Sequence, residues 1–184
     1  MQHFVSGIDL NKIPQDYKSI ILGAGCFWGV ERRFWEDPNI YLTSVGYSGG
    51  HIDNPTYKQV CYEDTGHVEV VKVIFDPQLI SLEEILKIFW ECHDPSQGDR
   101  QGNDRGTQYR SVIFCENEKD LNLANQSKKK YQEVLSEAGF GEITTEIKIF
   151  NTYFLAEYYH QQYLAKNPNG YCGLGGTGCA FPNN

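Results

Sequence analysis

The chain alternates short apolar runs, typical of buried strands, with longer segments in which apolar residues recur every three or four positions, typical of helices. The pattern predicts strands over 19–22, 41–47, 67–75, 109–115 and 144–150. It predicts helices over 26–35, 82–93, 118–138 and 153–166. Residues 51–66 and 94–106 carry turn signals and are predicted to be loops.

Two of these segments carry strong local signals. Ser81 and Glu84 form the two ends of a capping box, which indicates that a helix begins directly after Ser81. In the strand from 67 to 75, alternate residues point to the same face of the sheet. This alternation predicts that the carboxylate of Glu69 lies in line with the apolar side chains of Val71 and Val73.

Strands that alternate with helices over one short chain predict a single α+β domain. We expect a two-layer α/β sandwich with a ferredoxin-like mixed sheet of about five strands and flanking helices. An N-terminal arm is expected over residues 1–18 and the catalytic α/β domain over 19–166. Residues 167–184 are rich in glycine and are expected to form an irregular, mobile C-terminal tail.

The charge of the chain limits its partners. It has 24 acidic and 16 basic residues and a formal net charge of -8. Nucleic acid and anionic membranes are therefore not expected as partners, because both bind basic surfaces. The first residues lack the apolar core of a signal peptide, and we expect a soluble cytoplasmic protein.

Six cysteines are expected to be thiols in a reducing compartment. Their spacing provides neither a CxxC pair nor a Cys/His pattern of a zinc site, and no metal is expected. Any disulfide would then be transient and catalytic. The cysteines are Cys26, Cys61, Cys92, Cys115, Cys172 and Cys179.

The stretch GAGCFWG, residues 23–29, joins a predicted strand to a predicted helix. A thiol in the first turn of a helix is a candidate nucleophile, because the free N–H groups there favour the thiolate. Phe27 and Trp28 would form an apolar socket for a small group such as a methyl. The alternative is that Cys26 is an ordinary buried core cysteine, and this feature alone leaves both interpretations open.

Cys172 and Cys179 are separated by six residues within the glycine-rich tail. A thiol on a segment that can bend back toward the domain is suited to resolve an oxidised partner as a disulfide. Exposed free thiols without a use are a liability, so the pair indicates redox chemistry.

Five short motifs occur in order along the chain. They are GCFWG at 25–29, GHVEVV at 66–71, NDRGTQYRS at 103–111, AEYYHQQYL at 156–164 and GYCGLGGTG at 170–178. Together they resemble the peptide methionine sulfoxide reductases of the A type, from about Ser19 to Cys179.

The resemblance implies a role for particular residues. Cys26 would attack the sulfoxide sulfur and Glu69 would protonate the sulfoxide oxygen. Tyr57 and Tyr109 would hydrogen-bond that oxygen, and Asp104 would help to hold the substrate main chain or a water network. A neutral Glu69 is chemically reasonable, because burial raises the pKa of a carboxyl group.

The resemblance also implies how substrate is held and how the enzyme is recycled. Phe27 and Trp28 would hold the substrate methyl group, and the S epimer at sulfur would be selected. Cys172 would resolve the sulfenic acid of Cys26, and Cys179 would then exchange to give a Cys172–Cys179 disulfide. Thioredoxin or another dithiol would reduce that bond. No metal or organic cofactor is implied, and a monomer is expected.

Two other function classes compete with this interpretation. One is a cysteine hydrolase or acyltransferase in which His51, His67 or His160 activates Cys26. It leaves the tail cysteines without a role. The other is a binding module whose aromatic pocket holds a peptide methionine without reaction. Glu157 and His160 are interpreted as structural residues that dock the last predicted helix.

Overall fold

A computed structural model describes residues 1–150 and 152–182. Residue 151 of the expected catalytic domain and residues 183–184 of the expected tail lie outside the described residues. In chain order the elements are β1 (Lys18–Gly23), α1 (Phe27–Trp35), β2 (Ile40–Ser48), α2 (Tyr57–Tyr62), β3 (Val68–Phe75), α3 (Leu82–Cys92), β4 (Arg100–Gln101), β5 (Asp104–Arg105), the 3-10 turn η1 (Thr107–Tyr109), β6 (Val112–Cys115), α4 (Glu118–Glu137), β7 (Glu146–Ile149), β8 (Tyr153–Leu155) and α5 (Tyr163–Lys166).

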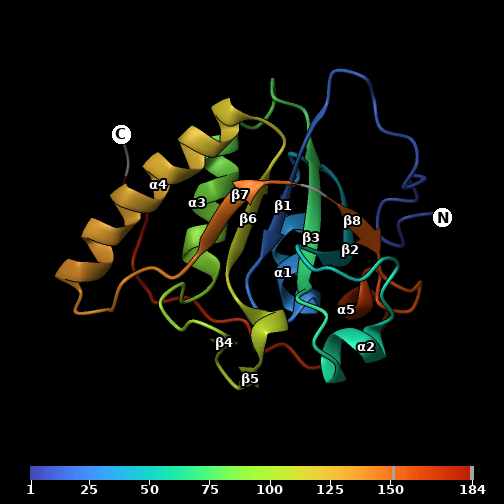
Figure 1. The fold of residues 1–184 in the computed structure, drawn as a ribbon. Helices are drawn as coiled ribbons and strands as arrows, with labels where there is room; N and C mark the ends of the chain where they lie inside the picture. Colours follow the sequence, from blue (N-terminus) through green and yellow to red (C-terminus); the bar gives the residue numbers. More distant parts are fainter. Residues whose placement is uncertain (151, 183–184) are drawn as a thin grey trace.

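The main sheet is mixed and has the order β7-β6-β1-β3-β2-β8 (Figure 1). Its central strands, β6-β1-β3-β2, are antiparallel, and they follow the β-α-β-β-α-β succession of ferredoxin-like folds. At the edges, β7 pairs parallel with β6 and β8 pairs antiparallel with β2. The predicted α+β fold with a ferredoxin-like mixed sheet is therefore confirmed.

The main core lies between the sheet and the helices α1, α3 and α4. Alternate residues of β1 and β3 point into this core, and Val71 and Val73 of β3 pack there with Phe34 and Trp90 of the helices. A smaller cluster around Val70 covers the opposite face of the sheet, with Phe150 and Tyr153 packed on it. The sheet is thus buried on both faces, with helices on one face only.

The predicted loop over 51–66 is wrong in part, because it contains the short helix α2. Thr56 caps this helix, and Gln59 completes a capping box with it. The same sequence signal was used for the helix at 82–93. Here the turn signals Asn54-Pro55 and Thr65-Gly66 led to the prediction of a loop instead of a helix.

The predicted helix over 153–166 is also wrong in its first part. Residues 153–155 form the edge strand β8, and only residues 163–166 are helical. Gln162 has a left-handed backbone with φ of 47°, which interrupts helical geometry directly before α5. Gln161 instead hydrogen-bonds both the N–H and the C=O of Val45. Tertiary contacts of buried amide side chains therefore override the helical pattern.

The N-terminal arm reaches into the domain. His3 is buried, and its Nε2 lies 3.1 Å from Oγ1 of Thr43 on β2. Thr43 in turn donates to the buried carboxylate of Glu31 on α1. The backbone N–H of Phe4 donates to Gln162. The arm is therefore fastened to α1, β2 and the segment before α5.

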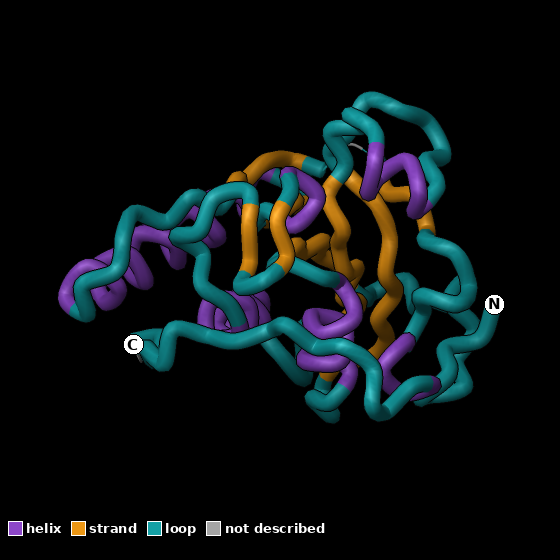
Figure 2. The backbone as a smooth tube through the Cα atoms, turned by 90° about the horizontal axis from the view of Figure 1, so that it is seen from below, coloured by secondary structure: helices purple, strands orange, loops and turns teal. Residues whose placement is uncertain are grey.

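The C-terminal tail has no regular secondary structure over its described residues, in agreement with the prediction. It crosses the molecule from the side of α5 to the side of α4 (Figure 2). Tyr131 of α4 donates a hydrogen bond to the carbonyl of Cys179, and the N–H of Phe181 donates to Glu91 of α3. The ring of Phe181 stacks on that of Tyr131. Side chains of the helices thus hold the tail in place.

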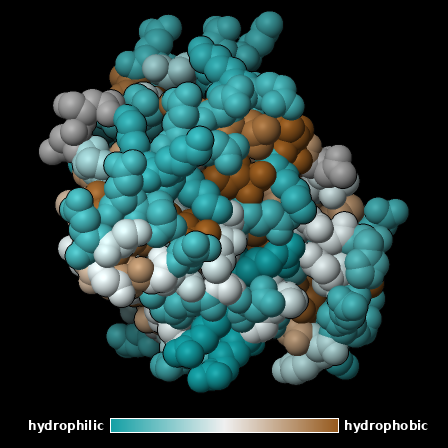
Figure 3. Space-filling model, turned by 60° about the vertical axis from the view of Figure 1, so that its left-hand side comes forward, coloured by the Kyte–Doolittle hydropathy of each residue, from teal (hydrophilic) through white to brown (hydrophobic). Residues whose placement is uncertain are grey.

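The side of the molecule that carries α4 shows mainly hydrophilic residues, with apolar side chains in limited patches (Figure 3). Among the described residues, the helices are too short or too polar to cross a bilayer.

The edge strand β8 approaches β2 closely at Gly46. A Cβ atom at this position would lie 2.5 Å from the carbonyl oxygen of Phe154 and 2.6 Å from the ring of Tyr153. We expect Gly46→Ala to lower the free energy of unfolding by about 1–3 kcal/mol, because such overpacking displaces backbone. Urea unfolding measures this value. Gly141→Ala is the control, since the nearest atom would lie at 3.9 Å. Equal stability of both variants would contradict the β2–β8 packing.

Candidate active site

Cys26 is the residue immediately before α1, in the corner between β1 and that helix. Gly25 has φ of 93°, a conformation that favours glycine. A Cβ at Gly25 would also lie 2.7 Å from the side chain of Gln101. The glycines of the GAGCFWG stretch therefore allow a sharp strand-to-helix corner, and Cys26 remains half-buried there.

Glu69 lies beneath this corner. It is 1% exposed, on the face of β3 that points toward the helices, as the alternation predicted. The backbone N–H of Phe27, in the first turn of α1, donates to Oε2 of Glu69 over 3.1 Å. Burial raises the pKa of Glu69 to about 8, and the charge of Asp104 adds to this, although the Phe27 N–H acts in the opposite direction. The carboxyl group is therefore mostly protonated at neutral pH.

The thiol of Cys26 also keeps its proton in the resting protein. Burial raises its pKa most, an ionised Glu69 would raise it further, and the negative charge of Asp104 adds to this, while the backbone N–H of Trp28 favours the thiolate. The helix N-terminus favours the thiolate, but desolvation outweighs this effect on the pKa of Cys26 in this state. A thiol and a protonated carboxyl group lie side by side.

Two tyrosines and an aspartate from three other elements surround the pair. Tyr57 begins α2, Tyr109 ends η1, and Asp104 begins β5. Burial raises the pKa of both tyrosine hydroxyls, and Glu69 lies close enough to raise both further when it is ionised. The structure thus brings together five residues that the sequence analysis selected, although they are far apart along the chain.

Phe27 and Trp28 are both beside the thiol but in different environments. Phe27 is 1% exposed, and its ring lies 5.1 Å from that of His160. Trp28 is half-buried, stacks on Tyr163 at a centroid distance of 3.9 Å, and donates from Nε1 to Nδ1 of His160 over 3.0 Å. Trp28 therefore offers the accessible aromatic surface, while Phe27 supports it from the core.

The AEYYHQQYL motif supplies residues around the site whose contacts the sequence did not reveal. Glu157 accepts hydrogen bonds from the hydroxyl of Tyr47 at 2.8 Å and the backbone N–H of Tyr57 at 2.9 Å, so it fixes the start of α2. His160 is buried, and burial lowers its pKa to about 4. Because its Nδ1 accepts from Trp28, its Nε2 carries the proton. Within the described residues, that Nε2 has no partner.

The structure places the two tail cysteines differently. The Sγ atom of Cys172 accepts a hydrogen bond from Nη2 of Arg32 on α1 over 3.3 Å. Its neighbour Tyr171 donates to Oδ2 of Asp104 over 3.3 Å. Cys179 instead lies beside Tyr131 of α4. All six cysteines are free thiols in this structure.

A histidine that could activate Cys26 is not apparent in the described contacts. The ring of His67 binds the carbonyl of Ile52 and the N–H of Gly50, and Nδ1 of His160 is bonded to Trp28. His51 is exposed. These contacts disfavour the hydrolase interpretation.

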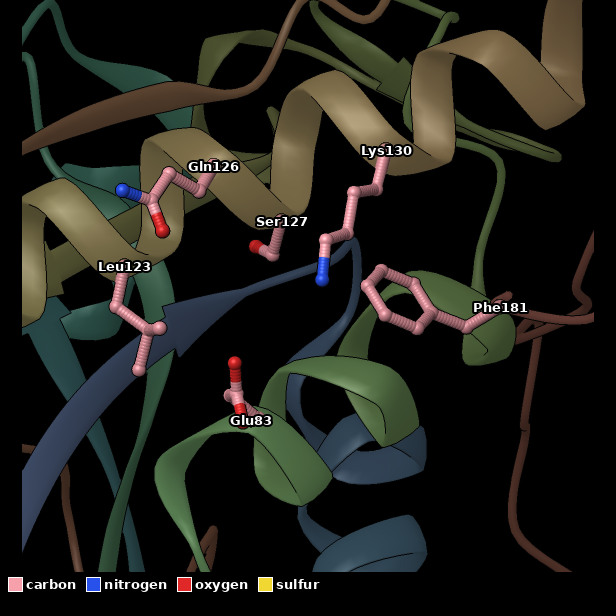
Figure 4. A pocket seen from close by; sticks show the side chains of 6 residues that line it. All are labelled: Glu83, Leu123, Gln126, Ser127, Lys130 and Phe181. Atoms are coloured by element: carbon pink, nitrogen blue, oxygen red, sulfur yellow. The ribbon is translucent and has the colours of Figure 1, made fainter. Parts of the chain in front are cut away.

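Other parts of the surface do not provide an alternative centre. Within residues 1–150 and 152–182, no group of three or more His, Cys, Asp or Glu residues could hold a metal ion. A small pocket between α3 and α4 is lined by Ser127, Lys130 and Phe181 (Figure 4). Its lining includes none of the residues around Cys26.

Replacing Glu69 tests its protonation in the folded protein. The folded carboxyl group keeps its proton up to about pH 8, whereas the unfolded one loses it near the ordinary value of 4.5. The folded state thus binds more protons between these values, and stability falls as pH rises through them. Glu69→Gln does not titrate and still accepts the Phe27 N–H. Relative to the unchanged protein, it should gain stability on the order of a few kcal/mol between about pH 5 and about pH 9.

Urea unfolding of both proteins across this pH range measures the difference. The exposed Glu83→Gln is the control and should show no such trend. A pH-independent difference for Glu69→Gln would mean that the buried carboxyl group is ionised throughout.

Comparison with known proteins agrees with this geometry. The family model described as peptide methionine sulfoxide reductase matches residues 18–177. The human mitochondrial peptide methionine sulfoxide reductase is 56% identical over 182 residues, which cover 98% of this chain and 77% of the human protein.

Solved structures give the same result. Methionine sulfoxide reductase A of Corynebacterium diphtheriae superposes with a TM-score of 0.88 at 41% identity, over 98% of this chain and 89% of that chain. Mxr1 from Saccharomyces cerevisiae in complex with Trx2 superposes with a TM-score of 0.58 at 25% identity, over 84% of this chain and 91% of that chain. The chain therefore belongs to the peptide methionine sulfoxide reductase family, A type, whose members are oxidoreductases that reduce methionine sulfoxide.

Proposed function

We propose that this protein reduces methionine S-sulfoxide, free or in proteins, to methionine, with Cys26 as nucleophile and Glu69 as acid. The observation that supports this most is the pairing of a buried, protonated Glu69 with the first turn of α1 directly beside the Cys26 thiol. Reduction of a sulfoxide needs these two groups together, because its oxygen leaves only when it is protonated.

In the first half-reaction the sulfur of Cys26 attacks the sulfoxide sulfur. Glu69 gives its proton to the sulfoxide oxygen, and the proton of the thiol returns to Glu69. The oxygen passes to Cys26, which becomes a sulfenic acid, and the sulfoxide becomes a thioether. Two electrons move from the sulfur of Cys26 to the sulfur of the substrate, so no metal or organic cofactor is required.

The surrounding side chains orient the substrate. Tyr57 and Tyr109 lie close enough to Glu69 to interact with it electrostatically, and their hydroxyls are suited to bind the sulfoxide oxygen, since burial keeps both protonated. Asp104 helps to hold the substrate main chain or water. The methyl group lies against Trp28, with Phe27 behind it. Only the S epimer places its methyl against the rings while its oxygen points to Glu69.

Two further thiols complete the cycle. Cys172 attacks the sulfenic acid of Cys26 to form a disulfide and release water, and Cys179 then exchanges to give Cys172–Cys179. An external dithiol reduces that bond, and the complex of yeast Mxr1 with Trx2 supports thioredoxin in this role. The protein would act as a monomer in a compartment such as the cytoplasm, where cysteines remain reduced.

A single-turnover thiol count tests the function. The reduced protein, freed of reductant, is mixed with methionine S-sulfoxide or R-sulfoxide, and free thiols are titrated. We expect the S epimer to remove two thiols and release one methionine, with the disulfide mapped by peptide mass to Cys172 and either Cys26 or Cys179. The R epimer should remove none. Binding of sulfoxide without thiol loss would favour the binding module instead.

The relay to Cys179 is tested separately. We expect Cys179→Ser to release the first methionine at the normal rate but to lose thioredoxin-dependent turnover, because Cys26–Cys172 would remain as a less accessible disulfide. Steady-state assays with thioredoxin and its reductase measure this loss. Full turnover by the variant would show that thioredoxin reduces the first disulfide directly. Cys115→Ser is the matched control, because Cys115 is buried in β6.

A further inference from the structure

The resolving thiol is held along α1 close to its target. Cys26, Gly29 and Arg32 are three residues apart in succession, so they follow one row along the helix surface. A Cβ at Gly29 would lie 2.9 Å from Sγ of Cys172. The sulfur therefore packs on α1 about one turn from Cys26, where three residues rise by about 4.5 Å along the axis.

Two contacts fix this position. The guanidinium Nη2 of Arg32, one turn further along α1, donates to Sγ of Cys172 over 3.3 Å. On the other side, the hydroxyl of Tyr171 binds Asp104. Gly29 is required between them, because its missing side chain leaves the space that the sulfur occupies. Tyr171 and Cys172, which precede the glycines of the tail, are therefore held by Asp104 and by Arg32.

Several titratable or charged groups surround Cys172. A cavity of about 360 Å³ adjoins the thiol. Besides Arg32, the charged or titratable groups that line it are Arg33 of α1, Glu36 directly after α1, and Glu91 and Cys92 of α3. Cys26, Tyr171 and Asp104 lie on the side of the catalytic corner. Among these groups, Arg32 is the cation that donates a hydrogen bond to the sulfur.

From this geometry we propose that Arg32 is a positioning residue for the resolving step, which holds the sulfur of Cys172 one helical turn from Cys26. Its cationic N–H donor also suits the negative charge that the sulfur carries during its attack, since the hydrogen bond then joins opposite charges. The inference rests on the proposed role of Cys172 as the resolving cysteine. It adds the group that prepares that thiol before the sulfenic acid forms.

The resolving step consists of proton loss from Cys172, attack on Cys26 and release of water. The proton of Cys172 leaves to solvent through the adjoining cavity. The thiolate attacks the sulfur of the Cys26 sulfenic acid, so that an S–S bond forms and the S–O bond breaks. The oxygen leaves as hydroxide and takes one proton to become water. Cys172 is oxidised and Cys26 is reduced by the same pair of electrons.

The test uses the full chain with Cys179→Ser, in which the cycle stops at the Cys26–Cys172 disulfide. After mixing with methionine S-sulfoxide, samples are quenched with an alkylating reagent, and methionine release and disulfide formation are followed separately. Arg32→Met should slow disulfide formation by about tenfold, because a hydrogen bond to a charged group contributes roughly one decade in an equilibrium constant. Methionine release should keep its rate.

Two further variants separate charge from packing. Arg32→Lys retains the cation and should recover most of the rate. Arg33→Met removes a neighbouring cation that lines the same cavity and should behave as the parent. Recovery of the rate in Arg32→Lys but not in Arg32→Met would identify the cationic donor as the group that matters.

The outcomes distinguish a failure of the role of Arg32 from a failure of the proposed function. An unchanged rate of disulfide formation in Arg32→Met would overturn the role of Arg32. A parent that releases no methionine would instead refute the proposed function. A parent that releases methionine but forms no Cys26–Cys172 disulfide would refute the role of Cys172 and this inference with it.

Discussion

The hydrogen bond from the first turn of α1 to the buried carboxyl group of Glu69 is the contact on which the site depends. It joins the helix that presents Cys26 to the strand that lies under it, over 3.1 Å. The donor, the backbone N–H of Phe27, is one of the free N–H groups that begin any helix. Since Glu69 is 1% exposed, burial dominates its pKa and keeps it protonated. The bond thus orients an acid without ionising it.

Residues 153–166, from β8 to α5, stabilise this arrangement from outside. The pairing of β8 with β2 places Glu157 against the start of α2 and His160 against Trp28. A continuous helix over 153–166 would present these side chains at different angles. The strand, the turn at Gln162 and the short helix α5 are therefore a requirement of the site, which explains why the helical pattern of the sequence is not followed there.

Local signals were sufficient for strands β1, β2, β3, β6 and β7, for the long helices and for the corner at Cys26. Alternation on β3 placed Glu69 on the correct face, and the glycines around Cys26 indicated a strand-to-helix turn. The pattern failed where side chains from distant segments decide the backbone, as with Gln161 and Val45. The protonation of Cys26 was also beyond the sequence, because it depends mainly on how deeply the corner is buried.

The tail shows how an irregular segment can hold a definite position. A glycine-rich chain loses much conformational entropy on ordering, and its own backbone supplies few hydrogen bonds within regular structure. Here, side chains of α1, α3 and α4 supply the partners: Arg32, Glu91 and Tyr131 each bond a tail atom. Three separate contacts of this kind are individually weak. The relay that we propose requires parts of the tail to leave these contacts in turn, and several weak, separate contacts on a glycine-rich chain suit that requirement better than one extensive interface would.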